Sequence, residues 1–281
     1  MAKFTAILAI IVALAATRAS ATPIISDPLT GSGDLFSSAP QTDTYNPGDT
    51  WLAYPAPTTL PSNFARTASG TTVAADNNFF PGGQGSAASA ASLAFVPTAG
   101  NIYMLQATVT VTGGNAGDWA FLGFGGSQSD TFIYSNNADV PGPWMLIRSS
   151  ALSGQQADDI QTFSNGESNS ADYTGANSGS IDIPQTLSMV LNTTAAHWKI
   201  SYYENGGLLG SFTYSGSNPT TIGSVNFGEY VTTTATFTSF SLTLVPEPSS
   251  ITLLGLGAIG CGVVLLQRRH ARKLNGAAIK L

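Results

Sequence analysis

The sequence predicts an all-β protein: an antiparallel two-sheet jelly-roll sandwich, flanked by an N-terminal signal helix and a C-terminal transmembrane helix. Three observations support this fold class. No segment of residues 22–244 shows a sustained helical period of apolar residues, whereas short alternating or continuous apolar runs are frequent. Gly, Pro, Asn and Ser separate these runs without intervening helices. With more than 200 residues and long strands, the body fits a jelly roll better than an immunoglobulin domain.

The clearest strand is residues 101–112, where apolar residues alternate with Gln and Thr. One face of this strand is predicted to be Tyr103, Leu105, Ala107, Val109 and Val111. Further strands are predicted at residues 119–124, 144–148, 185–191, 197–204, 208–214 and 221–227, with a final strand containing Phe240, Leu242 and Leu244.

Turns and loops connect these strands. Asn205-Gly206 predicts a type I′ hairpin turn, because both residue types tolerate positive φ angles. Two polar stretches, residues 67–92 and 153–180, are predicted to be loops. We find no internal repeat and no linker that divides the body.

Charge and cysteine content exclude several classes of function. Residues 21–245 contain fifteen carboxylates but only three cations (Arg66, Arg148 and Lys199), a net charge of −12. A domain this acidic repels phosphate backbones, so nucleic acid is not an expected partner. The single cysteine, Cys261, lies in the C-terminal apolar run, so the body has no disulfide, thiolate metal site or catalytic cysteine.

The N-terminus has the three parts of a cleavable secretory signal. Lys3 supplies the positive charge, residues 4–16 form the apolar stretch, and Ala19 and Ala21 form the small-x-small cleavage site. Residues 1–21 are therefore predicted to be removed on export. An uncleaved anchor is the alternative, but thirteen apolar residues are short for a bilayer.

The C-terminus has a proline-rich stop, an apolar run and a basic cluster. Pro246 and Pro248 end the last strand, because proline cannot continue a hydrogen-bonded ladder. Residues 251–266 carry no charge and form the predicted transmembrane helix. The basic residues that follow predict a cytoplasmic end and an extracytoplasmic body.

This order closely resembles the PEP-CTERM sorting signal of bacterial exported proteins. The resemblance implies residues 245–273 as the signal, 274–281 as a cytoplasmic tail, and an exosortase as the membrane enzyme that processes the chain near Pro-Glu-Pro. It also implies an association with exopolysaccharide. An ordinary single-pass anchor is the alternative. The matching residues are Pro246, Glu247, Pro248, Arg268, Arg269 and Arg272.

The body resembles concanavalin-like or laminin-G-like sandwiches. The resemblance rests on residues 186–214, which include the Asn-Gly turn, on the closing strand at 237–244, and on residues 29–51 as the opening segment. Such sandwiches include glucanases, which carry paired carboxylates in a Glu-x-Asp-x-x-Glu strand. None of the body's glutamates, Glu167, Glu204 or Glu229, stands in that pattern.

The residues for nucleophilic catalysis are also missing from the sequence pattern. His197 is the only histidine of the body, it is predicted to lie in a strand, and no Gly-x-Ser-x-Gly sequence presents a serine. One histidine also excludes a histidine-rich zinc centre. We therefore expect no catalytic residues and no enzyme activity.

Binding remains as the expected function. The aromatic residues available for sugar contacts are Trp51, Tyr54, Trp119, Tyr134, Trp144, Tyr173, Tyr202 and Tyr203, although most aromatic side chains in a sandwich belong to its core. No cofactor is predicted. Calcium is an open alternative, because Asp158, Asp159, Glu167 and Asp172 fall in one predicted loop, where solvated charges are the simpler explanation.

The sequence thus predicts a non-enzymatic protein of the cell surface or extracellular matrix whose candidate ligand is extracellular polysaccharide. A purely structural envelope or matrix component is the first alternative, and a glycoside hydrolase the second. No ligand-binding residue is assigned.

Overall fold

The computed structural model describes ten segments of the chain. Within them, regular secondary structure is entirely β-strand. No helix in these segments is long and apolar enough to cross a membrane. The predicted signal and transmembrane helices lie outside the described residues. These residues are 21–54, 63–74, 88–112, 119–126, 142–148, 159–164, 172–176, 183–219, 222–230 and 234–246.

Sheet A contains ten strands, in the order β15-β14-β13-β8-β17-β6-β5-β2, with β1 paired to β17 and β3 paired to β1. The first part of β17 pairs with β6 and its second part with β1, so this long strand is central. The strands are β1 (Thr22–Asp27), β2 (Gly33–Asp34), β3 (Thr42–Asp43), β5 (Phe64–Thr67), β6 (Gly70–Ala74), β8 (Ile102–Thr112), β13 (Gln185–Asn192), β14 (Lys199–Glu204), β15 (Gly207–Thr213) and β17 (Thr234–Val245).

Sheet B contains seven strands, in the order β12-β11-β10-β9-β16-β7-β4. The strands are β4 (Leu52–Tyr54), β7 (Ala88–Ala94), β9 (Trp119–Gly125), β10 (Trp144–Arg148), β11 (Asp159–Phe163), β12 (Tyr173–Ala176) and β16 (Ser224–Tyr230).

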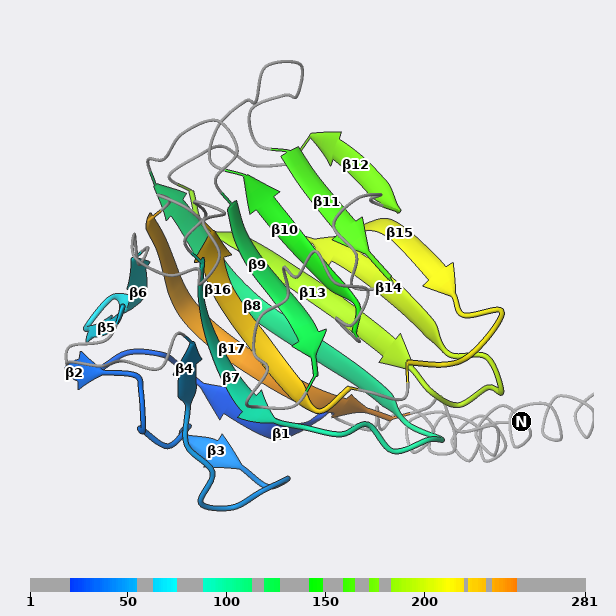
Figure 1. Ribbon diagram of the computed structural model, residues 1–281, viewed down its shortest axis with the longest axis horizontal. Coiled ribbons are helices and arrows are strands. Elements are labelled where there is room, and N and C mark those ends of the chain that lie inside the picture. The colour runs from blue at the N-terminus through cyan, green and yellow to red at the C-terminus, as the bar shows by residue number, and fades with distance from the viewer. Residues whose placement is uncertain are drawn as a thin grey trace, which may run out of the picture. The chain divides into compact units, whose positions relative to one another are not determined.

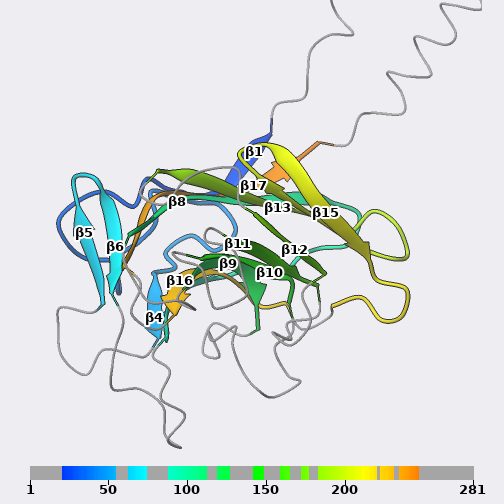
Figure 2. The same cartoon turned by 90° about the horizontal axis from the view of Figure 1, so that it is seen from above.

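The two sheets lie face to face, as Figures 1 and 2 show. Every strand pairing among the described residues is antiparallel. The predicted all-β antiparallel two-sheet architecture is confirmed. We call the side of each sheet that faces the other sheet its inner face, and the opposite side its outer face.

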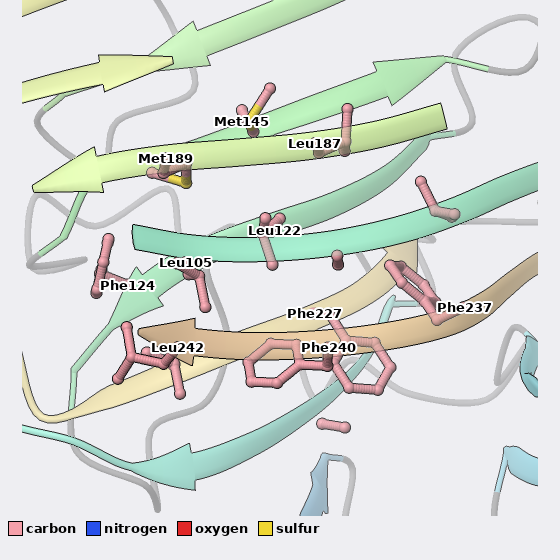
Figure 3. Packing of buried hydrophobic residues seen from close by; sticks show 14 of the residues in the cluster. Leu105, Leu122, Phe124, Met145, Leu187, Met189, Phe227, Phe237, Phe240 and Leu242 are labelled. Carbon is pink, nitrogen blue, oxygen red and sulfur yellow. The ribbon is translucent and has the colours of Figure 1, made fainter. Parts of the chain in front are cut away.

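The main core lies between the inner faces (Figure 3). In β8 every second residue is buried, beginning with Tyr103 and ending with Val111, as the alternation in the sequence predicts. Leu187 and Met189 of sheet A meet Leu122 and Met145 of sheet B in this core.

The hairpin between β14 and β15 is also confirmed. Asn205 and Gly206 have φ angles of 48° and 81°, the positive values that a type I′ turn requires. The Asn205 side chain holds the neighbouring strand β13, because its Oδ1 accepts a hydrogen bond from the Thr186 N–H at 2.9 Å.

The two predicted loops contain strands, which is a correction. Residues 67–92 include β6 and most of β7, and residues 153–180 include β11 and β12. β7 consists mainly of Ala and Ser, so its sequence lacks the bulky alternation that marks a strand. It is nevertheless a paired strand between β16 and β4, where Ser89, Ala90, Ala91 and Ser92 are buried.

The largest differences from the predicted strand boundaries are in β14, β16 and β17. β16 begins at Ser224 rather than 221, and β17 begins at Thr234, before the predicted apolar alternation. His197 is exposed in the turn before β14, not within that strand. The chain bends at residues 194–197, so the strand begins only at Lys199.

A buried polar network holds the N-terminal segment to sheet A. Asp27 is 1% exposed, and its carboxylate accepts hydrogen bonds from the Leu29 N–H, the Trp51 indole N–H and the Arg66 guanidinium. The Arg66–Asp27 ion pair has an N–O distance of 2.9 Å. Trp51 in turn packs edge-on against the core ring of Phe227.

Residues 21–245 form one compact unit. Its first and last strands are neighbours, since Thr22 is the register partner of Leu244. β17 pairs with β8 through its last residue, Val245, directly before Pro246. This unit contains the whole of the core described above.

Candidate functional site on the outer face of sheet B

Sheet B buries aromatic side chains on both faces. In β16, Val225 and Phe227 belong to the main core, so the residues that alternate with them face outward. A second cluster of buried apolar residues lies on this outer face: Ala90, Trp119, Phe121, Trp144, Leu146 and Phe163, with Tyr230 packed against them.

Two stacked ring pairs organise the outer cluster. Trp119 of β9 stacks on Tyr230 of β16, with ring centroids 4.5 Å apart and planes inclined by 8°. Trp144 of β10 stacks on Phe163 of β11 at 4.1 Å and 12°. Each pair joins register partners on adjacent strands. The pairs are linked by a contact of 5.4 Å between the two indoles, so the cluster is one rigid unit.

A line of polar side chains runs beside the rings. The Arg148 guanidinium donates to Gln161 Oε1 at 2.9 Å, and Gln161 Nε2 donates to Thr174 Oγ1 at 3.4 Å. Arg148 is also the register partner of Trp119, which places the cation at the end of the aromatic cluster. Arg148 is half-buried and Thr174 is exposed.

A buried amide closes the other end of this face. Asn226 is fully buried and sits over Gly125, where a Cβ atom would lie 2.0 Å from an atom of the Asn226 amide group. In the orientation that satisfies both amide atoms, Asn226 accepts from the Gly125 N–H at 3.0 Å and donates to Ser224 Oγ at 3.2 Å. Gly125 is therefore needed for the close approach of this side chain.

Exposure to solvent is confined to the rim of the cluster. Trp119 is 4% exposed and Trp144 is 0% exposed, so these rings form a buried floor. Tyr230, Arg148 and Thr174 remain partly or fully exposed around it. The face thus combines aromatic rings with a few polar groups at their edge. This is the usual composition of a sugar-contacting site.

The two described glutamates lie away from the outer face of sheet B. Glu229 is buried and alternates with the outward residues of β16, so it faces inward. Glu204 ends β14 in sheet A. These two glutamates therefore do not form an acid and nucleophile pair for glycoside cleavage on this face.

The predicted aromatic candidates divide between core and surface. Trp51 and Tyr202 are core residues, and Tyr173 packs against the core. Tyr203 is half-buried on the outer face of sheet A, so of the Tyr202–Tyr203 pair only Tyr203 points outward, as expected. Trp119 and Trp144 belong to the outer cluster. Tyr134 and the Tyr54 side chain lie outside the described part of the structure.

Sequence reasoning missed Phe121, Phe163, Tyr230, Arg148 and Gln161 as members of this site. The signal available in the sequence was the uninterrupted run of apolar residues and glycine in β9. A strand without polar positions has an apolar outer face as well as an apolar inner face. The pairing of Arg148 with Gln161 depends on strand register, which no local pattern gives.

The four acidic residues considered for calcium do not share a loop. Asp159 begins β11, and Asp172 is exposed just before β12. The Asp172 N–H donates to the Thr162 carbonyl, which ties it to the strand pair. Asp158 and Glu167 lie outside the described residues. No group of three or more metal-ligating side chains occurs among the described residues.

Few of the predicted processing residues are described. Ala21 is exposed immediately before β1, and Pro246 follows β17 directly. The other predicted processing residues, namely Ala19, Glu247, Pro248, Arg268, Arg269 and Arg272, lie outside the described structure.

Comparison with known proteins supports the C-terminal signal. The PEP-CTERM protein-sorting motif matches residues 244–269. The match confirms the predicted sorting signal. It includes Pro-Glu-Pro, Arg268 and Arg269 and ends before Arg272. No curated protein matches the sequence.

Solved structures share the fold of the body. The endo-1,3-β-glucanase of Streptomyces sioyaensis is 13% identical, with 83% of this chain and 99% of that chain covered and a TM-score of 0.50. A structure reported with endo-acting O-glycanases of the human gut microbiota is 8% identical, with 80% of this chain and 100% of that chain covered and a TM-score of 0.50. The carbohydrate recognition domain of Emp47p is 10% identical, with 82% of this chain and 99% of that chain covered and a TM-score of 0.49. The two structures with a TM-score of 0.50 share the concanavalin-like β-sandwich fold of the body, and at identities this low the likeness shows the fold alone.

Proposed function

We propose that this protein is exported and sorted to the cell surface or matrix, where its sandwich binds glycan without cleaving it. The sorting motif at residues 244–269 supports the destination. The predicted signal peptide at 1–21 supports export, and an exosortase-type enzyme is the proposed processing partner near Pro246. The body is extracytoplasmic in this proposal and is held by the C-terminal segment until processing.

The outer face of sheet B carries the glycan-binding proposal. Tyr230, stacked on the buried Trp119, presents a partly exposed ring, and Arg148, Gln161 and Thr174 nearby are hydrogen-bonded to one another in a line. Sugars offer apolar C–H faces to such rings and hydroxyls to such polar groups. Because the rings are locked by stacking, little side-chain entropy is lost on binding.

The charge of the body favours a neutral glycan. Residues 21–245 carry a net charge of −12, which repels polymers rich in uronic acid or sulfate. Arg148 is the only described cation on the outer face of sheet B, and its guanidinium is engaged by Gln161. We expect Arg148 to donate to sugar hydroxyls rather than to serve as an anion site.

Binding is favoured over hydrolysis by the chemistry of the described side chains. Glycoside cleavage needs two carboxyl groups separated by roughly 5–9.5 Å across the sugar. The described outer face offers aromatic rings, amides, hydroxyls and one guanidinium instead. Turnover of a polysaccharide, abolished by a single carboxylate substitution, would contradict the non-enzymatic proposal.

The test is co-sedimentation of residues 22–245 with a panel of insoluble polysaccharides, with and without calcium. We expect retention on a neutral polymer, independent of calcium, that is weakened by Tyr230→Ala and by Arg148→Ala. The matched control is Tyr203→Ala, which removes a half-buried tyrosine from the outer face of sheet A. Equal loss in all three variants, or no retention on any polymer, would count against this site.

A further inference from the structure

The ends of the two sheets differ in length. Sheet B ends in β4, with three residues, and β12, with four. Sheet A ends in β2, with two residues, while β15 at the opposite end has seven. Short edge strands are a common protection against unwanted strand pairing, because they offer few free backbone groups. β15 is the long exception.

The side chains of β15 offer little other protection. Its sequence, Gly-Leu-Leu-Gly-Ser-Phe-Thr, has no charge and no proline, although lysine and proline are the usual guards of an edge. Leu208 is 62% exposed, and Ser211 and Thr213 are also exposed. One irregularity remains, a register shift between Tyr202 and Tyr203 on β14 that leaves Leu209 as an extra residue.

One side of the β15 backbone is not paired with another strand among the described residues. The Tyr214 N–H donates to the Trp198 carbonyl at the end of the hairpin. In an antiparallel ladder the direction of N–H groups alternates, so Phe212 also points toward β14. The N–H groups of Ser211 and Thr213 consequently point away from β14, and β15 pairs with no second strand among the described residues.

We propose that β15 pairs antiparallel with β15 of a second copy of this chain, which joins two ten-stranded sheets edge to edge. A row of backbone donors and acceptors is complementary to another extended strand. Two bodies of net charge −12 repel, so an uncharged edge is where they approach at lowest electrostatic cost. The pairing is self-complementary, as a two-fold symmetric interface requires.

The charged residues of β14 next to this edge are compatible with the pairing. Lys199 is the register partner of Thr213 at one end of β15, and the buried Glu204 is the register partner of Gly207 at the other. In an antiparallel pair the two Thr213 ends lie apart by about 20 Å, the length of a seven-residue strand. The two Lys199 side chains therefore do not face each other.

The strand that ends the sandwich lies in the same sheet as β15. Val245, Ile102, Asn192, Lys199 and Thr213 form one row across sheet A, so the last residue of β17 is level with the Thr213 end of β15. The compact unit of residues 22–245 contains the whole of this sheet and is therefore the form to test.

The experiment is sedimentation velocity of residues 22–245 over a wide concentration range, with hydrogen exchange of the same samples. We expect a dimer whose fraction rises with concentration and slower exchange of the Ser211 and Thr213 amides in the dimer. Leu208→Lys adds a charge to the edge, and Ser211→Pro removes an outward N–H. Both should remain monomeric while circular dichroism shows them folded.

The matched control is Ala65→Lys, which adds the same charge at an exposed position of β5, near the other end of sheet A. It should dimerise like the parent. A parent that stays monomeric at every concentration overturns the proposal, and so does a dimer that both edge variants retain. Neither result depends on glycan retention, which is measured separately.

Discussion

The hydroxyl of Tyr202 donates a hydrogen bond to the carbonyl oxygen of Phe163, with an oxygen–oxygen distance of 2.8 Å. Tyr202 belongs to β14 of sheet A, whereas Phe163 ends β11 of sheet B. The bond thus crosses the core and holds the backbone of a residue whose ring stacks on Trp144 in the outer cluster. The core and the candidate glycan face are connected through this contact.

Tyr202→Phe is expected to destabilise the fold and loosen the outer cluster. The substitution keeps the ring but leaves the buried Phe163 carbonyl without this donor, which costs about 1–3 kcal/mol. Urea unfolding should show the loss of stability, and near-ultraviolet circular dichroism should show a weaker tryptophan signal. An unchanged unfolding midpoint would mean that another group satisfies the carbonyl.

Stability should fall in alkali because two buried tyrosines resist ionisation. Burial raises the pKa of Tyr202 and of Tyr214 well above the ordinary value, and nearby Asp172 adds to both shifts. The unfolded chain therefore releases these protons at lower pH than the folded chain. The free energy of unfolding is therefore not reduced by these tyrosines below pH ~10. Above pH ~10 it falls by up to about 1.4 kcal/mol per pH unit for each tyrosine.

The measurement is the unfolding midpoint from pH 8 to 12, compared with Tyr214→Phe. The Tyr214 hydroxyl donates to the Ser164 carbonyl at 2.7 Å, so the variant should be less stable at neutral pH. Above pH ~10 its stability should decline less steeply than that of the parent, since one titrating group is gone. Parallel pH curves for the two proteins would contradict the assignment.

Asp27→Asn is expected to be among the most destabilising single changes in the N-terminal segment. It removes the charge opposite Arg66, whose side chain is only 14% exposed, and one acceptor from a carboxylate that holds both Arg66 and Trp51. Breaking one side of a buried ion pair costs about 3–5 kcal/mol. Thermal unfolding provides the measurement.

Asp43→Asn is the control for Asp27→Asn. Among the described residues, Asp43 Oδ1 accepts hydrogen bonds from the exposed backbone N–H groups of Tyr45 and Asn46, and its Oδ2 has no hydrogen-bond partner. Its substitution should change stability by less than about 1 kcal/mol, since an amide oxygen can accept the same bonds. Equal losses for the two variants would show that the Arg66 contact does not matter.

How far the sequence predicts this fold depends on the side chains in each strand. β8 alternates bulky apolar residues with Thr and Gln, so its inner face follows directly from the pattern. β7 is built from Ala and Ser, which carry almost no periodic signal, and it is recognised only through its neighbours β16 and β4. The strand was therefore predicted as a loop.

The candidate site was less predictable for a related reason. β9 is buried at every position, so its sequence does not distinguish the core residues Leu122 and Phe124 from the outward Trp119 and Phe121. Strand order makes that distinction, because it brings Tyr230 and Arg148 to either side of Trp119. Long-range register of this kind is not encoded by local spacing.

Gly228→Ala is expected to disrupt the centre of sheet B. A Cβ atom at Gly228 would lie 2.0 Å from the backbone oxygen of Ser89 and 2.9 Å from the Cα atom of Ala90, both on the adjacent strand β7. Because these are backbone atoms, β7 has to move away from β16 rather than rotate a side chain. Overpacking of this kind costs about 1–3 kcal/mol or more. The added methyl group would also press on the Phe121 ring, 2.8 Å away, so weaker glycan retention is expected as well.

Gly216→Ala is the matched control, since nothing lies within 4 Å of the Cβ atom that it adds. Urea unfolding of the two variants, followed by tryptophan fluorescence, separates a local clash from a general effect of replacing glycine. We expect the Gly216 variant to unfold at or slightly above the parent midpoint, because alanine restricts the unfolded chain more than glycine does. If Gly228→Ala also unfolds at the parent midpoint, the close approach of β7 and β16 is wrong. The small Ala and Ser side chains of β7 would then need another explanation than the tight spacing of these strands.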